Sequence, residues 1–273
     1  MAPSPNRRGG HAVFWTRLAT GVIAAPLFLL LVYAGFPYFN TLVTAIAAVM
    51  AWEFTRMDGE EGAKRRALIA AACVAAVIAM SVEMILLAWA IVVVATLAVI
   101  VADQVAGRPG LNLVQGAVPY VAVPAVSLVF LLARADWQTM FWLLAVVWLT
   151  DIGAYGFGRL IGGPKLAPAI SPNKTWAGAI GGLVTGTAAG LILLALVGVT
   201  PDWHFFGWSL LLAVLTEIGD LLESALKRKF QVKDSGGLIP GHGGVMDRFD
   251  GLWAAAPAAA LLCVAFGGGV ASW

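Results

Sequence analysis

Residues 84–102 read MILLAWAIVVVATLAVIVA, a run in which every residue but one threonine is apolar. A helix needs about 20 such residues to cross the hydrocarbon core of a bilayer. Of the 273 residues, 60% are hydrophobic and the mean hydropathy is +0.88, whereas soluble domains are roughly 45–50% apolar. Because the apolar runs are continuous rather than alternating, they favour helices over the strands of a membrane barrel. The sequence therefore predicts an all-α, polytopic integral membrane protein.

Further apolar runs lie on both sides of this one, so the chain is expected to cross the membrane about nine times. The predicted spans lie near 18–36, 38–55, 67–82, 84–102, 112–133, 138–158, 176–199, 206–226 and 251–270. The third run is short, so a broken or re-entrant helix is an alternative for residues 67–102.

Basic residues are distributed very unevenly between the two sides that nine spans define. The segments on one side hold 16 of the 17 Lys and Arg residues, and only Arg134 falls on the other. Since cytoplasmic loops collect such residues, the N-terminus is predicted to be cytoplasmic. The first run also resembles a signal peptide, with VYAG at 32–35 as a loose cleavage site, but its length favours a retained anchor. A net charge of +2 gives no reason to expect nucleic-acid binding.

The two halves of the chain differ in polarity. Residues 1–136, with about five predicted spans, hold few ionisable groups, and we interpret Glu53 and Glu83 near span ends as structural. Residues 137–273, with about four spans and cytoplasmic loops at 159–175 and 227–250, hold nearly every candidate site residue.

The first polar cluster is DIGAYGFGR at 151–159. Asp151, Tyr155 and Arg159 recur every four residues and share one helical face. An ionisable group within a span usually faces a cavity or a partner. The alternative is that Asp151 merely pairs with a lysine to complete the packing.

The second cluster is SPNKT at 171–175, immediately before a helix predicted to begin near Trp176. Free N–H groups and the dipole make a helix start suitable for anions. Ser171, Asn173, Lys174 and Thr175 are therefore candidate ligands of phosphate, although plain helix capping explains Ser and Thr equally well. The preceding glycines form no Walker motif, because Leu166 stands where Ser or Thr is required.

The third cluster runs from the eighth span into KRKFQVKDSGGLIPGHGGVMDRFDG at 227–251. Asp220, Ser224 and Lys227 lie on one stripe of the helix, with Glu217 one turn earlier. Carboxylates suit Mg²⁺, and the interleaved lysines and arginines suit a polyphosphate. The glycines beside His242 would permit close backbone approach to a ligand. A solvated charged loop is the alternative interpretation.

These residues resemble the signature of the CDP-diacylglycerol synthases, also called phosphatidate cytidylyltransferases. The matching positions are Ser224, Lys227, Arg228, Lys233, Asp234, Gly236, Leu238, Pro240, His242, Gly243, Gly244, Asp247, Arg248 and Asp250. SPNKT and DIGAYGFGR are similar to upstream segments of that family, so the resemblance covers about 100 residues, 151–251. One departure is Ala177, where the family usually has Glu.

The resemblance implies a reaction in phospholipid biosynthesis in which CTP and phosphatidic acid give CDP-diacylglycerol and pyrophosphate, with Mg²⁺ as cofactor. It implies Asp220 and Asp247 as metal ligands, which act in catalysis with Lys227 and Arg248. The implied substrate-binding residues are Asp151, Tyr155, Ser171, Asn173, Lys174, Thr175, Ser224, Arg228, Lys233, Asp234, His242, Gly243, Gly244 and Asp250.

The expected location is the bacterial inner membrane, with the site on the cytoplasmic side, where membrane lipid and CTP meet. A homodimer is compatible with the sequence. An ion-coupled secondary transporter is the alternative function, but it predicts ionisable groups near the midplane and pseudo-symmetric halves. Here the polar groups gather at one face and in one half.

Overall fold

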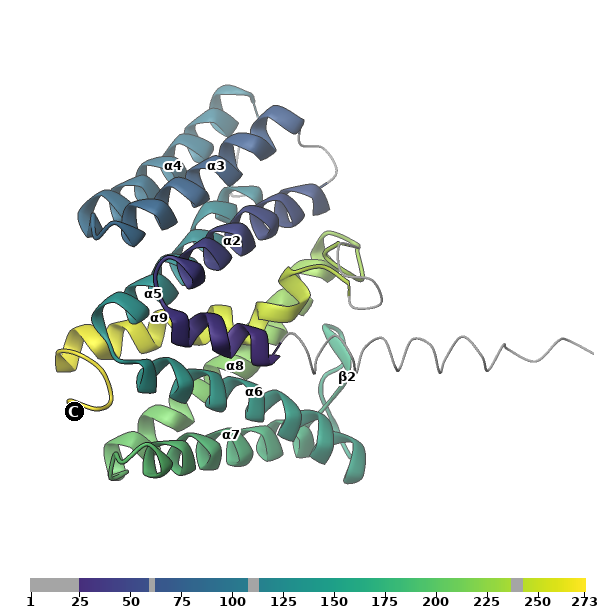
Figure 1. The fold of residues 1–273 in the computed structure, drawn as a ribbon. Helices are drawn as coiled ribbons and strands as arrows, with labels where there is room; N and C mark the ends of the chain where they lie inside the picture. Colours follow the sequence, from purple (N-terminus) through teal and green to yellow (C-terminus); the bar gives the residue numbers. More distant parts are fainter. Residues whose placement is uncertain (1–24, 59–61, 108–112, 237–242) are drawn as a thin grey trace, which may run out of the picture.

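The computed structural model describes residues 25–58, 62–107, 113–236 and 243–273 (Figure 1). Within them the chain is almost entirely helical, as predicted. The elements are a helical segment Ala25–Ala34, α2 Tyr38–Met57, α3 Ala63–Ser81, α4 Ile85–Val105, the 3₁₀ turn η1 Leu113–Gly116, α5 Ala117–Arg134, α6 Trp137–Leu160, β1 Lys165–Ala167, β2 Ser171–Thr175, α7 Trp176–Leu196, α8 Trp203–Lys229 and α9 Met246–Phe266.

Six of the described helices are long and apolar enough to cross a membrane: α4, η1 with α5, and α6 to α9. The chain is therefore an all-α membrane protein. The run at 84–102 became α4, which leaves most of its surface unburied and available to lipid. Because α3 and α4 are each continuous, the broken helix considered for residues 67–102 is not present in this described stretch.

The helices are arranged as a series of packed neighbours (Figure 1). The α3–α4 pair lies at one extreme and α6–α7 at the other, with α2, α5, α9 and α8 between them. Helix α5 packs against α2, α3 and α9, and α8 packs against α7 and α9. As a result, the end of α6, the start of α7, the end of α8 and the start of α9 come together.

Helices α6 and α7 pack more extensively than any other described pair because α7 places glycines every four residues along one face. A Cβ at Gly186 would overlap the Thr150 hydroxyl, and a Cβ at Gly182 would lie 2.9 Å from the Thr150 carbonyl. Small residues at such positions let two membrane helices approach backbone to backbone. The close approach fixes the distance between the polar ends of the two helices.

A short antiparallel hairpin precedes α7, a departure from the purely helical prediction. Strand β2 contains SPNKT and pairs with β1, with Lys165 opposite Thr175. The predicted start of the helix at Trp176 is confirmed, and so is capping by Thr175, whose Oγ1 accepts a hydrogen bond from Gly178 N at 3.1 Å. Ser171 lies instead at the beginning of β2.

Candidate active site

A cleft of about 520 Å³ opens where α6, β2, α7 and α8 meet. It collects residues from all three clusters that the sequence singled out. Its lining includes Asp151, Tyr155, Arg159, Asn173, Lys174, Thr175, Glu217 and Asp220. The helical face predicted for the first cluster is the face that lines this cleft, so Asp151 borders a cavity rather than a closed packing contact.

Lys174 lies between two carboxylates of α8. Its Nζ is 2.7 Å from Glu217 Oε2 and 2.9 Å from Asp220 Oδ2. Burial disfavours the charged amine, but the negative charges of Asp220 and Glu217 outweigh it, so the pKa of Lys174 stands above its ordinary value. Strand β2 therefore presents a permanent cation to the cleft.

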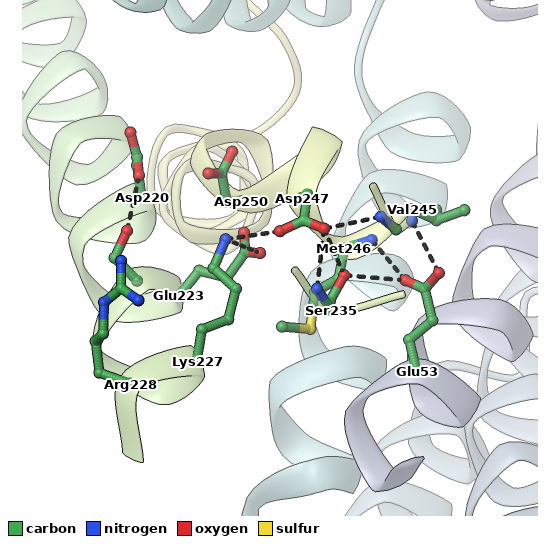
Figure 2. Close-up of polar contacts among 12 residues, drawn as sticks. Glu53, Asp220, Glu223, Lys227, Arg228, Ser235, Val245, Met246, Asp247 and Asp250 are labelled. Carbon is green, nitrogen blue, oxygen red and sulfur yellow. Dashed lines mark hydrogen bonds and ion pairs between the residues drawn. The ribbon is translucent and has the colours of Figure 1, made fainter. Parts of the chain in front are cut away.

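A second lysine has a similar pair of acidic partners outside the cleft lining (Figure 2). Lys227 Nζ lies 2.6 Å from Asp247 Oδ1 and 3.1 Å from Glu223 Oε1. The other oxygen of Asp247 accepts three hydrogen bonds, from Ser235 N at 3.0 Å, Ser235 Oγ at 2.9 Å and Gly244 N at 2.8 Å. Asp247 thus ties the end of α8 to the segments before and at the start of α9.

The glycines that precede α9 pack against carboxylates. Gly243 has φ +82°, and a Cβ there would lie 2.8 Å from Asp247 Oδ2. A Cβ at Gly244 would overlap the Ser235 hydroxyl. The structure therefore assigns these two glycines a contact within the protein, whereas the sequence pattern had suggested an approach to a ligand. His242 lies outside the described residues.

Glu53 is a member of this network that sequence reasoning missed. Its side chain is buried in α2, where Oε1 accepts from Val245 N at 3.0 Å and Oε2 from Met246 N at 2.9 Å. Sequence reasoning interpreted Glu53 as structural but did not place it beside the candidate site, because its position near a span end says nothing of which helix end it meets. A carboxylate in an otherwise apolar run was the signal that could have identified it.

The remaining candidates lie around these two networks. Ser224 Oγ donates to Asp220 Oδ1 at 3.4 Å, and Asp250 is placed between Asp220 and Asp247 in Figure 2. Arg228 Nε donates to the carbonyl of Ile170 at 3.3 Å, which ties α8 to the hairpin. Lys233, Asp234 and Arg248 are exposed, and none of them lines the cleft in the described part of the chain.

Comparison with known proteins identifies the family of this chain. A model of the cytidylyltransferase family matches residues 15–266. The chain belongs to this family. Phosphatidate cytidylyltransferases of Brucella suis biovar 1 and Brucella abortus biovar 1 are each 39% identical over 249 residues, which cover 88% of this chain and 90% of theirs. The enzyme of the same name from Staphylococcus haemolyticus is 51% identical over 106 residues, 38% of this chain and 41% of its own.

The charges of this cytidylyltransferase-family site fit a bound cation. The cleft and the two networks together contain two lysines and seven carboxylates, namely Glu53, Asp151, Glu217, Asp220, Glu223, Asp247 and Asp250. Glu217 Oε1 is buried without a hydrogen-bond partner in the described part of the chain, and the buried carboxylate of Glu223 has Lys227 Nζ, 3.1 Å from its Oε1, as an ion-pair partner.

No three His, Cys, Asp or Glu side chains of the described residues converge as a complete metal cage. Mg²⁺ does not require one, because it usually takes one or two carboxylates and completes its shell with water and substrate phosphates. The residues present are therefore compatible with a magnesium ion that arrives with a nucleotide.

Proposed function

We propose that this protein transfers the cytidylyl group of CTP to phosphatidic acid, giving CDP-diacylglycerol and pyrophosphate. The observation that carries the proposal is the 39% identity, over 88% of the chain, to proteins named phosphatidate cytidylyltransferase. The cleft supports it, since a lysine, an arginine and several carboxylates meet there at the ends of membrane helices. Such a position is accessible both to a water-soluble nucleotide and to a lipid headgroup.

In the proposed reaction a phosphate oxygen of phosphatidic acid attacks the α-phosphorus of CTP. The bond between the α-phosphorus and the bridging oxygen breaks, and the electron pair leaves with pyrophosphate. Because phosphate monoesters are largely ionised near neutral pH, the attacking oxygen needs no strong general base. Positioning and neutralisation of charge should therefore supply most of the acceleration.

The cations of the cleft would neutralise this charge. Lys174 is held in place by Glu217 and Asp220, and Arg159 donates to the Tyr155 hydroxyl at 2.8 Å. Lys227 does not line the cleft and has a fully buried partner in Glu223, so its contacts with Asp247 and Glu223 suit it to organising the carboxylates. Arg228, Lys233 and Arg248 are exposed basic residues close in sequence to Lys227 and Asp247, and they would attract an anionic nucleotide.

Magnesium remains a prediction, with Asp220 and Asp247 as its proposed ligands. Asp220 is the more available of the two, because its side chain is 35% exposed and it lines the cleft, against 9% for Asp247. A bound Mg²⁺ would offset the negative charge of the triphosphate and of the leaving pyrophosphate.

The proposed topology has nine spans with the N-terminus in the cytoplasm of a bacterial cell. It adds α2, α3 and the first apolar run to the six helices that meet the length and hydropathy criteria. The active site would lie on the cytoplasmic side of the inner membrane. A homodimer remains a prediction. Nothing favours the transporter alternative, because the family model and the similar relatives are cytidylyltransferases.

The decisive assay is incorporation of radiolabelled CTP into lipid by purified protein with phosphatidic acid and Mg²⁺. Wild-type protein should form a CDP-lipid and release pyrophosphate, and Asp220→Asn and Asp247→Asn should each abolish the product while the protein remains folded. A well-folded wild type that forms no CDP-lipid with several phosphatidic acids would overturn the proposal, and Ala177 would then be the first position to revert to Glu.

A further inference from the structure

Glu53 joins the N-terminal half of the chain to the candidate active site. It lies in α2, almost 200 positions before the residues that it binds. Its carboxylate accepts backbone hydrogen bonds from Val245 and Met246, which immediately precede Asp247. Its exposed fraction is only 5%. A carboxylate is expensive to bury, so its burial here is compensated by these donors.

The backbone donors that Glu53 binds are those of the start of α9. That helix has no side-chain cap of its own, because Val245 occupies the N-cap position. The first N–H groups of a helix lack partners within it, and a negative charge at this end interacts favourably with the helix dipole. Glu53 therefore caps α9 from a different helix.

Glu53 also contacts the chain on both sides of residues 237–242. A Cβ at Gly236 would lie 2.6 Å from Glu53 Oε1, and a Cβ at Gly244 would lie 2.6 Å from Glu53 Oε2. The backbone of both glycines thus packs directly on one carboxylate. This arrangement holds the end of the segment after α8 and the beginning of α9 in a fixed relation.

The link from Glu53 to Asp247 is short. Ser235 Oγ lies 3.4 Å from Glu53 Oε2 and 2.9 Å from Asp247 Oδ2. Its single proton can serve one carboxylate at a time, and the shorter distance favours Asp247. The backbone N–H groups that Glu53 binds belong to the two residues before Asp247 in the chain.

We propose that Glu53 is a positioning residue for cytidylyl transfer: it fixes the start of α9 and, with Ser235, the orientation of the Asp247 carboxylate. The N-terminal half of the chain thereby helps to build the active site. The kinetic part of this inference rests on the proposed function, whereas the structural part does not.

The test compares Glu53→Gln with Glu83→Gln, a matched change at an exposed glutamate paired with Arg134. Glutamine replaces one of the two carboxylate oxygens by an NH2 donor, so either Val245 N or Met246 N loses the acceptor that it has in the wild type. We expect Glu53→Gln to raise hydrogen–deuterium exchange in the peptide that contains both residues. It should also lower kcat by about 10- to 100-fold, the scale of a catalytic group displaced by a small distance, while KM for phosphatidic acid stays within about twofold. Glu83→Gln should change none of these quantities.

A second variant, Ser235→Ala, tests the route to Asp247 and remains informative if Glu53→Gln does not fold. It should lower kcat without raising exchange at Val245 and Met246, and adding it to Glu53→Gln should lower kcat by less than the product of the two single effects. Unchanged exchange at the start of α9 and unchanged kcat in folded Glu53→Gln would overturn the inference. A uniform rise in exchange across α6 and α7 with kcat preserved would also overturn it. Where Glu53→Gln does not fold, unchanged kcat in Ser235→Ala would do the same. If wild-type protein forms no CDP-lipid, the proposed function fails, and the exchange measurement alone still decides whether Glu53 holds α9.

Discussion

Lys174 and Lys227 each lie between two carboxylates, yet their surroundings differ. Lys174 comes from a strand and borders a cleft, and its partner Asp220 is 35% exposed. Lys227 lies on α8, and its partner Glu223 has no exposed side-chain surface. The same kind of ion pair therefore has a different role in each network. The open network can exchange partners with an incoming anion, while the closed one holds α8, α9 and the segment between them together.

The largest effect that separates the two networks should be on stability. Lys227→Met removes the cation beside Glu223, so a fully buried carboxylate loses its counter-ion, which costs about 3–5 kcal/mol. Lys174→Met should cost less, because water in the cleft can solvate Asp220 and the other partner, Glu217, keeps 10% of its side chain exposed against 0% for Glu223. Unfolding of the two variants in the same detergent measures the difference, and equal losses would mean that the two networks are equally closed.

The rate of transfer should show the opposite order. Lys174→Met removes a cleft cation and should lower kcat on the order of 100-fold, the scale observed when one group that stabilises developing charge is removed. Because the pKa of Lys174 is raised, the wild-type protein should keep this proton as the pH rises from about 7 to 9. A loss of activity in that range that disappears in Lys174→Met would contradict the assignment.

The position of the open network depends on the packing of α6 against α7. In Gly182→Ala the new methyl group would meet the Thr150 carbonyl and Glu217 Oε1, each at 2.9 Å. We expect a loss of about 1–3 kcal/mol in unfolding free energy and a lower affinity for CTP, because Glu217 must move. Gly207→Ala in α8 is the control, since a methyl group there meets nothing within 4 Å. It should raise the unfolding free energy by up to about 1 kcal/mol, because alanine favours the helix more than glycine does.

The smallest effect is expected at an ion pair that belongs to neither network. Glu83 and Arg134 lie 3.0 Å apart, with 66% and 48% of their side chains exposed. Glu83→Gln should change the unfolding free energy by no more than about 1 kcal/mol and leave turnover unaltered. A large loss here would show that exposed pairs in this protein are as important as the enclosed ones.

Sequence reasoning predicted well those features that depend on local pattern. Four-residue spacing placed Asp151 and Tyr155 on one face, and the polar SPNKT segment indicated where α7 begins; the structure has both. The sequence could not reveal the acidic partners of Lys174, because they lie 43 and 46 positions away in another element. Glu223, by contrast, stands four residues before Lys227 on α8, a spacing from which a helical ion pair can be predicted. Like the partners of Lys174, Glu53 was missed, since no local pattern shows which distant helix end a carboxylate will cap.

The row of glycines on α7 has a consequence for how the protein tolerates different membranes. A bilayer that is thicker or thinner than the apolar length of a helix is accommodated by tilting or by local deformation of the lipid. Because α6 and α7 meet backbone to backbone, with Thr150 against Gly182 and Gly186, they have little freedom to slide past each other. The pair should tilt as one body, so that Asp151 and Lys174 keep their separation across membranes of different thickness.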